Sequence, residues 1–312
     1  MPPTPELAAL ELSIEDVDCD VGAVPLPSYG GDRPTSVVCV RGLGATGRGE
    51  HVGWTGAAHA AFRAAAGSVP RGGWRLDAWV AEVARRPRHP YDRAALEAAA
   101  IDLALRQAGT DLFRLLGVTP QPVRYVVSFG RVRDPYAEAR HHPGVELKVD
   151  VDPAWDDDVY RALAALGRVA VLDFKGSGDA ATVARARRAL PDVLIEDPPP
   201  GAAVGPVSFD GSIARAEDVA ALPVRPTAVN LKPARMGGVL ELLRCAAVCA
   251  EAGIGVYIGG MFEVGVGRAQ LRTLAALLCP DATNDIAPLP GDGPRPPRLP
   301  VGASEPGFGG EA

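Results

Sequence analysis

VAVLDFK, residues 169–175, is the stretch that decides the fold, because it is a short apolar run that ends in charged residues. The same pattern recurs on both sides of it, about once per β/α unit. The other runs end at Lys148, Glu196, Asp210 and Lys232. In a closed parallel barrel the C-terminal ends of the strands converge on one mouth, where barrel enzymes keep their chemistry. Carboxylates and lysines gathered at one mouth indicate a hard-cation site flanked by proton-transfer groups.

The chain from residue 122 onward alternates between strand-like and helix-like segments. Short apolar runs predict strands at 123–129, 145–151, 169–174, 193–196, 207–210, 228–232, 255–260 and, weakly, 284–287. Apolar residues at helical spacing predict helices at 156–166, 180–190, 215–222, 238–252 and 267–279. Such alternation is typical of a parallel sheet with both faces covered, and eight strands predict a closed barrel.

The first 120 or so residues lack this alternation. Residues 35–41 predict a strand, and a glycine-rich turn follows it and ends at Gly49-Glu50. From 91 to 116 apolar residues recur at helical spacing, and Gly117 can end the helix. The N-terminal third therefore predicts a separate α+β module.

Composition restricts the class of protein and its partners. The 312 residues, 47% hydrophobic and 22% charged, suit a barrel with a smaller module. A net charge of −6 without a basic stripe argues against nucleic acid as the main partner. The sequence contains no run of about 18 apolar residues, so we expect no membrane span. Five scattered cysteines, and an N-terminus unlike a signal peptide, lead us to expect a cytoplasmic protein.

Two blocks late in the chain carry a family resemblance. They read VNLKPARMGG at 229–238 and IGGMFEVGVGR at 258–268, and ALEAAAIDLA at 95–104 accompanies them. Together they resemble the enolase superfamily, particularly its muconate-lactonizing, dipeptide-epimerase and o-succinylbenzoate-synthase types, over nearly the whole chain. The resemblance implies a modified TIM barrel, (β/α)7β, at residues 122–289 and an α+β capping domain at 1–121. It also implies that the tail, 290–312, packs back on the cap.

The resemblance further implies a Mg2+ site with one carboxylate from each of strands three, four and five, Mn2+ being a possible alternative. Counting strands gives these roles to Asp173, Glu196 and Asp210. In this family a proton is removed from the carbon α to a carboxylate, and a divalent cation stabilises the charge of the resulting enolate. Lys232 matches the sixth-strand lysine, which acts there as an acid or base or as a cation beside the enolate.

Several positions depart from the family pattern. The second strand normally carries Lys-x-Lys, whose second lysine is the base, but residues 148–150 read Lys-Val-Asp and place Asp150 there. Residues 173–175 read Asp-Phe-Lys where Asp-x-Asn is usual, so Lys175 either replaces the lost base or pairs with Asp150. Strand five lacks the glutamate expected after its aspartate, and the connection before it is short. In an alternative register residues 173–175 are the altered Lys-x-Lys and Asp197 is the third-strand ligand, which leaves one strand without a counterpart.

These residues predict a Mg2+-dependent isomerase, a racemase, epimerase or cycloisomerase acting on a carboxylate substrate. Two-base racemisation needs a base on each face of the substrate: Lys232 serves one, and Lys175 or Lys148 would have to serve the other. An eliminating lyase of the o-succinylbenzoate-synthase kind, or a dehydratase, needs only one base. A third alternative is a catalytically silent member whose mouth carboxylates are paired by lysines. No histidine lies after His142, which excludes the branches that use a strand-seven histidine.

Two further residues are candidates for substrate binding. Arg235 follows the sixth strand, where it can pair with a mouth carboxylate or with a substrate anion. Glu263 lies in the segment that resembles the family's seventh strand. The expected partner is a small-molecule carboxylate, and the resemblance also leads us to expect a homo-oligomer.

Overall fold

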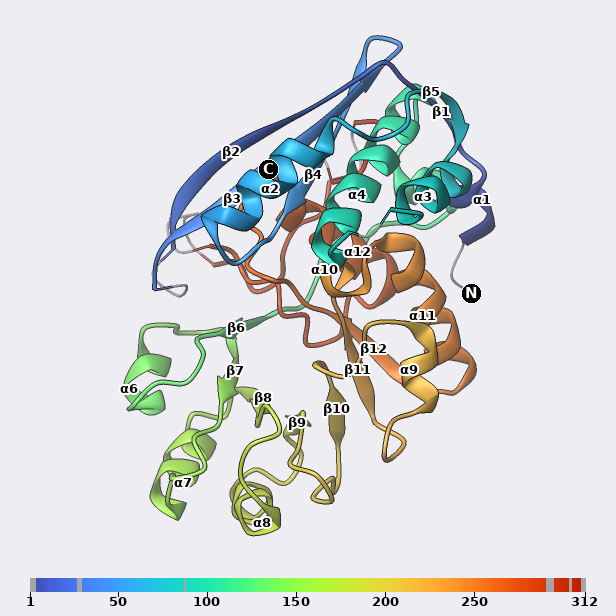
Figure 1. Ribbon diagram of the computed structural model, residues 1–312. Coiled ribbons are helices and arrows are strands. Elements are labelled where there is room, and N and C mark those ends of the chain that lie inside the picture. The colour runs from blue at the N-terminus through green and yellow to red at the C-terminus, as the bar shows by residue number, and fades with distance from the viewer. Residues whose placement is uncertain (1–3, 27–29, 87, 290–294, 303–304, 310–312) are drawn as a thin grey trace.

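The computed structural model describes residues 4–26, 30–86, 88–289, 295–302 and 305–309 (Figure 1). Its larger part is a seven-stranded parallel sheet in which the strands follow one another in chain order. The strands are β6 (Val126–Ser128), β7 (Glu146–Asp150), β8 (Val169–Asp173), β9 (Leu194–Glu196), β10 (Val207–Phe209), β11 (Ala228–Leu231) and β12 (Gly255–Ile258). The helices between and after them are α6 (Pro135–Arg140), α7 (Asp157–Ala165), α8 (Ala180–Ala189), α9 (Ala216–Ala220), α10 (Pro233–Met236), α11 (Val239–Glu251) and α12 (Val266–Leu278). The predicted modified TIM barrel is confirmed.

The eighth segment of the barrel is shorter than the strand predicted at 284–287. It consists of two isolated bridges, in which Asn284 pairs with Tyr125 and Asp285 pairs with Gly259. The segment therefore joins the first strand of the sheet to the last. The Asn284 side chain supports it, because its Oδ1 accepts the Ile258 N–H at 2.8 Å.

The N-terminal part is an α+β domain, as predicted, built around two antiparallel sheets. The larger sheet contains β2 (Asp16–Leu26), β3 (Gly31–Gly42) and β4 (Ala45–His51), and the smaller pairs β1 (Glu11–Ile14) with β5 (Gly72–Arg75). The helices are α1 (Thr4–Ala8), α2 (Gly56–Ala66), α3 (Leu76–Ala84), α4 (Pro90–Gln107) and α5 (Leu112–Leu115). Figure 1 shows this domain over one end of the barrel sheet.

Helix α4 packs very closely on strand β4. A Cβ atom at Gly49 would lie 2.0 Å from the backbone oxygen of Ala95, so only glycine fits there. The facing helix residues Ala95 and Ala99 are 1% and 0% exposed. The alanine-rich run at 94–104 is thus explained by the close approach of a helix to a strand.

Two carboxylates of the N-terminal domain bind the N-termini of barrel helices. Glu97 of α4 accepts the Leu240 N–H of α11 at 2.7 Å. Glu50 of β4 accepts three N–H groups from residues 264–267, at the start of α12, at 2.7, 2.9 and 3.0 Å. The glycines that precede these helices offer no capping side chain. The acidic groups satisfy the exposed backbone donors and suit the positive end of each helix dipole.

Glu97 makes the stability of this junction depend on pH. Burial raises its pKa from 4.5 to about 7, although the Leu240 and Val239 N–H groups and Arg93 lower it. The folded chain therefore takes up a proton between about pH 7 and pH 4.5 that the unfolded chain does not, and this contribution to stability is lost as the pH rises through 7. We expect the free energy of unfolding of Glu97→Gln, relative to the wild type, to rise by on the order of 3 kcal/mol between pH 5 and pH 8. Urea unfolding at both pH values measures it, and an equal difference at both would contradict it.

The described parts of the C-terminal tail contact both halves of the molecule. Phe308, 1% exposed, donates its N–H to Asp102 Oδ1 of α4 at 2.8 Å. Leu299 pairs with Val123 in an antiparallel bridge beside the first barrel strand. Residues 290–294, 303–304 and 310–312 of the predicted tail lie outside the described residues, and the domain limits at 121 and 289 stay predictions. None of the described helices is long and apolar enough to span a membrane.

Candidate active site

The strand ends bring the predicted charged residues to the C-terminal end of one sheet. In strand order they are Lys148 and Asp150 on β7, Asp173 on β8, Glu196 on β9, Asp210 after β10 and Lys232 after β11. All six are buried, at 8% exposure or less. Because β6 is the first strand of the sheet, Asp173 lies on the third. Asp197 follows the fourth strand, so it cannot be the third-strand ligand that the alternative register required.

Lys148 lies among three carboxylates. Its Nζ is 2.6 Å from Glu196 Oε1, 3.1 Å from Asp173 Oδ2 and 3.2 Å from Asp285 Oδ2. Burial alone would lower the pKa of Lys148, but these carboxylates together raise it well above its usual value. Lys148 is therefore an ammonium ion that holds carboxylates of strands three and four.

Lys175 pairs with both acids beside it. Its Nζ lies 2.8 Å from Asp173 Oδ2 and 3.4 Å from Asp150 Oδ2, and its side chain is 51% exposed. The two departures from the family pattern on strands two and three thus compensate each other, with a carboxylate where a lysine is usual and a lysine on the next strand. Of the three mouth lysines, Lys175 is the one whose side chain is half open to solvent.

Asp210 pairs with two cations, Lys232 and Arg235. Lys232 Nζ lies 2.8 Å from Asp210 Oδ2. Arg235 in α10 donates to Asp210 Oδ1 and to the Asp210 backbone oxygen, the latter at 2.6 Å. Burial would raise the pKa of Asp210, but Lys232, Lys148 and Arg235 hold it well below its usual range. The predicted substrate partner Arg235 is therefore occupied by a mouth carboxylate.

Glu196 contacts both Lys148 and Tyr257. It is 0% exposed and accepts a hydrogen bond from the Tyr257 hydroxyl at 2.6 Å. Burial raises its pKa to about 7; Lys148 opposes this shift, whereas Asp173 and Asp210 add to it.

Glu263 lies apart from this group. It is 4% exposed, and its Oε2 accepts the Met261 N–H at 2.7 Å, which fixes the turn after β12. Burial and the nearby Glu50 raise its pKa. Its predicted part in substrate binding stays a prediction.

Sequence reasoning missed two residues of the site. Asp285 lies in the weak eighth segment predicted at 284–287, but no apolar run precedes it, so the pattern that locates the other strand-end acids does not locate Asp285. Tyr257 lies inside β12, where aromatic residues are common. Nothing in the sequence therefore distinguishes it from a tyrosine that only packs in the sheet.

The donor groups at the mouth suit magnesium in kind. Asp173, Glu196 and Asp210 lie on adjacent strands, and carboxylate oxygens are the ligands that Mg2+ prefers. Two further buried oxygens, Asp150 Oδ1 and Asn230 Oδ1, have no hydrogen-bond donor among the described residues. As the side chains are arranged, however, each of the three carboxylates has a cationic partner. In this arrangement Lys148 bridges Asp173 and Glu196, Lys232 pairs with Asp210, and no three or more His, Cys, Asp or Glu side chains of the described residues form a ready metal-binding group.

Comparison with known proteins identifies a family and its relatives. Residues 5–115 and 119–290 match the models of the N-terminal and C-terminal domains of a family described as "Domain of unknown function (DUF8230)". An N-succinylamino acid racemase of Thermus thermophilus is 32% identical over 212 residues, which are 61% of this chain and 58% of the relative. An o-succinylbenzoate synthase of Geobacillus kaustophilus is 30% identical, over 59% of this chain and 56% of the relative. The alignments thus span less than two thirds of these relatives' length.

Solved structures share the fold over almost the whole chain. A dipeptide epimerase from Methylococcus capsulatus, complexed with Mg ion, has a TM-score of 0.76 at 25% identity and covers 96% of this chain and 99% of its own. A dipeptide epimerase from Enterococcus faecalis has a TM-score of 0.80 at 21% identity, with the same coverage of 96% and 99%. At such low sequence identities, the structural similarity establishes a shared fold only.

Proposed function

The chain belongs to the DUF8230 family and to the enolase superfamily, and on this premise we propose that it is a Mg2+-dependent enzyme. It removes the α-proton of a small carboxylate substrate and acts as an isomerase: a racemase, epimerase or cycloisomerase. The named relatives of the chain are enzymes of this general kind. Because the alignments cover only part of them, their substrates are not carried over.

The observation that supports the proposal most strongly is that a lysine lies at each end of a row of three carboxylates. The row runs across β8, β9 and β10, with Lys175 at the β8 end and Lys232 beyond the β10 end, after β11. A substrate carboxylate above the row would have an amine on each side. Removal and return of a proton on opposite faces needs such an arrangement.

Each residue of the mouth has a role in the proposed reaction. Lys232 Nζ exchanges the proton on one face of the α-carbon and Lys175 Nζ on the other. Arg235 and Lys232 both contact the Asp210 carboxylate, so Arg235 helps to fix the position of Asp210 and, through it, of Lys232. Lys148 neutralises part of the charge of Asp173 and Glu196, and Asp150 orients Lys175.

The proposed ligands of the magnesium ion are Asp173, Glu196 and Asp210. When bound, the ion supplies positive charge for the enolate that forms on the substrate carboxylate. A cation also suits the charge of the mouth: Asp150, Asp173, Glu196, Asp210 and Asp285, with Asp197 beside Asp210, give six negative charges, against the four positive charges of Lys148, Lys175, Lys232 and Arg235. The formal balance of the mouth is −2.

A second candidate is an eliminating lyase of the o-succinylbenzoate-synthase kind. The observation that favours it is the pairing of Lys175 with two carboxylates, Asp150 and Asp173, which makes Lys175 a poor proton acceptor. Elimination with one base would need only Lys232.

We also propose that the protein is cytoplasmic, in keeping with its five free cysteines, and that it forms homo-oligomers.

Proton exchange with solvent tests the proposed reaction. The protein is incubated in D2O with Mg2+ and a library of N-acyl amino acids and dipeptides, and the α-proton signals are followed by NMR. We expect the signal of at least one compound to disappear while its other signals stay. If no compound exchanges, and no other carboxylate in a wider library does, the catalytically silent alternative is the better account.

A further inference from the structure

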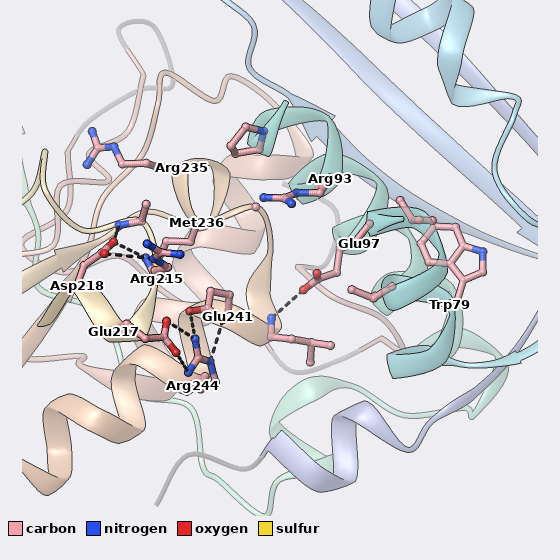
Figure 2. A pocket seen from close by; sticks show the side chains of 17 residues that line it. Trp79, Arg93, Glu97, Arg215, Glu217, Asp218, Arg235, Met236, Glu241 and Arg244 are labelled. Atoms are coloured by element: carbon pink, nitrogen blue, oxygen red, sulfur yellow. Dashed lines mark hydrogen bonds and ion pairs between the residues drawn. The ribbon is translucent and has the colours of Figure 1, made fainter. Parts of the chain in front are cut away.

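A second cavity lies outside the barrel mouth, at the seam between the two halves of the molecule. It has a volume of about 780 Å3 and is lined by helices α3 and α4 of the N-terminal domain and by α9, α10 and α11 of the barrel. Figure 2 shows its side chains. A volume of this size is within the range of small-molecule sites.

Most of the charged groups around the cavity are already paired with each other. Arg244 binds Glu217 at 2.7 and 2.8 Å and Glu241 at 2.8 and 2.9 Å. Arg215 pairs with Asp218 at 3.4 Å. The dashed lines in Figure 2 mark these contacts along the barrel side of the cavity. A ligand gains little from groups that are already paired.

Arg93 is different. It extends from α4 into the cavity toward α10 (Figure 2). Its Nε atom is buried next to Gly237 and has no hydrogen-bond partner in the part of the chain that the structure describes, so an anion would meet the two Nη groups of Arg93. The nearby Glu97 interacts electrostatically with Arg93, but its Oε1 accepts the Leu240 N–H, and burial raises its pKa to about 7, so it is a weak counter-charge. A guanidinium group carries five donors in a planar fork that matches a carboxylate, so Arg93 is the cation of this cavity that can take up an anion.

Apolar side chains form the wall next to Arg93. Trp79, Val80 and Val83 of α3 and Met236 and Leu240 of α10 and α11 line the same cavity. Val80 and Leu240 are partly exposed and Trp79 is fully buried, so Val80 and Leu240 present the accessible apolar surface of this wall. A cavity with one available cation and an apolar wall suits a ligand with one anionic group and an apolar body.

We propose that this cavity is a second binding site, for a small amphipathic carboxylate whose anionic group pairs with Arg93 and whose apolar part packs against Val80 and Leu240. The site is separate from the mouth but adjoins it through α10, whose Arg235 holds Asp210 and whose first turn follows Lys232. The inference stands on the cavity alone and does not rest on the proposed reaction.

Calorimetric titration of the wild-type protein gives the first test. The probes are phenylacetate, the neutral phenylacetamide, and acetate, which has the charge without the apolar body. We expect phenylacetate to saturate one site in about the millimolar range, and both other probes to bind at least about tenfold more weakly. No saturable binding of phenylacetate, or equal binding of the amide, would overturn the proposal.

Variants locate the bound probe. We expect Arg93→Gln to weaken phenylacetate binding by about ten- to a hundredfold, because a hydrogen-bonded charge pair is lost. Arg85→Gln, at the exposed end of α3, is the matched control and should bind as the wild type does. Lys232→Ala should also bind as the wild type does. Loss of binding in Lys232→Ala with retention in Arg93→Gln would place the probe in the mouth and overturn the proposal.

Discussion

Replacement of Lys148 by methionine is expected to lower the free energy of unfolding by about 3–5 kcal/mol. The Lys148 side chain is 2% exposed, and two of the carboxylates that it holds, on Asp173 and Glu196, are 1% and 0% exposed. Methionine fills a similar volume but leaves these negative charges without their common partner in a buried place. Urea unfolding followed by circular dichroism measures the loss.

Lys175→Met is the matched control for Lys148→Met. Its side chain is 51% exposed, and Asp173 keeps Lys148 when Lys175 is removed. Asp150 loses its lysine, but burial already raises its pKa, so it can take up a proton instead. We expect this variant to lose no more than about 1 kcal/mol. If the three carboxylates also bind Mg2+, added Mg2+ should stabilise Lys148→Met more than the wild type, because a bound cation stabilises the folded state. A loss in Lys148→Met as small as that of the control would contradict the central place of Lys148.

The second large effect is expected on proton exchange, which Lys232→Ala should slow by about 10²–10⁴-fold. In a two-base racemase each lysine serves one enantiomer. Lys232→Ala should then stop exchange of one enantiomer, and Lys175→Met should stop exchange of the other. In a one-base enzyme Lys175→Met should leave exchange largely intact. The rates are measured by NMR in D2O with each enantiomer separately.

Metal affinity separates a chemical role of Lys175 from a structural one. If Lys175 is a base, Lys175→Met should abolish turnover while Mg2+ affinity, measured by calorimetry, stays within a few-fold of the wild type. Wild-type rates for both enantiomers would remove Lys175 from the mechanism and favour the lyase. Wild-type rates in Lys232→Ala would overturn the assignment of the sixth-strand lysine.

The barrel could be predicted from the sequence because parallel strands repeat one simple pattern. Each apolar run ends at the same edge of the sheet, so the charged residues that follow the runs had to meet there. Asp173, Glu196 and Lys232 were located in this way. The same pattern is absent at Asp285, because no apolar run precedes it and the eighth segment pairs through only two bridges.

Part of the N-terminal domain was missed although its signal was present. In β2 the aspartates Asp16, Asp18 and Asp20 are exposed, and Val17 and Cys19 between them are buried, which is the period of two expected for a half-buried strand. The pairing of the mouth charges could not be predicted from the sequence. It depends on which lysine reaches which carboxylate across strands, and sequence spacing does not determine that.

The second cavity was also beyond sequence reasoning. Its walls come from α3 and α4 on one side and from α9, α10 and α11 on the other, so it exists only once the two halves are placed together. Arg93 stands in the sequence as one arginine at the start of a helix. Only its surroundings distinguish it.

The most direct test of the account is to follow α-proton exchange in one protein sample before and after removal of divalent cations. The substrate is any compound that exchanges in the library, and the protein is dialysed against a chelator and then given Mg2+. The account predicts that exchange stops on chelation and returns with Mg2+, while circular dichroism shows that the fold persists. Exchange that continues unchanged after chelation would contradict a magnesium site at Asp173, Glu196 and Asp210, and would leave the lysines and arginine as the only cations of the mouth.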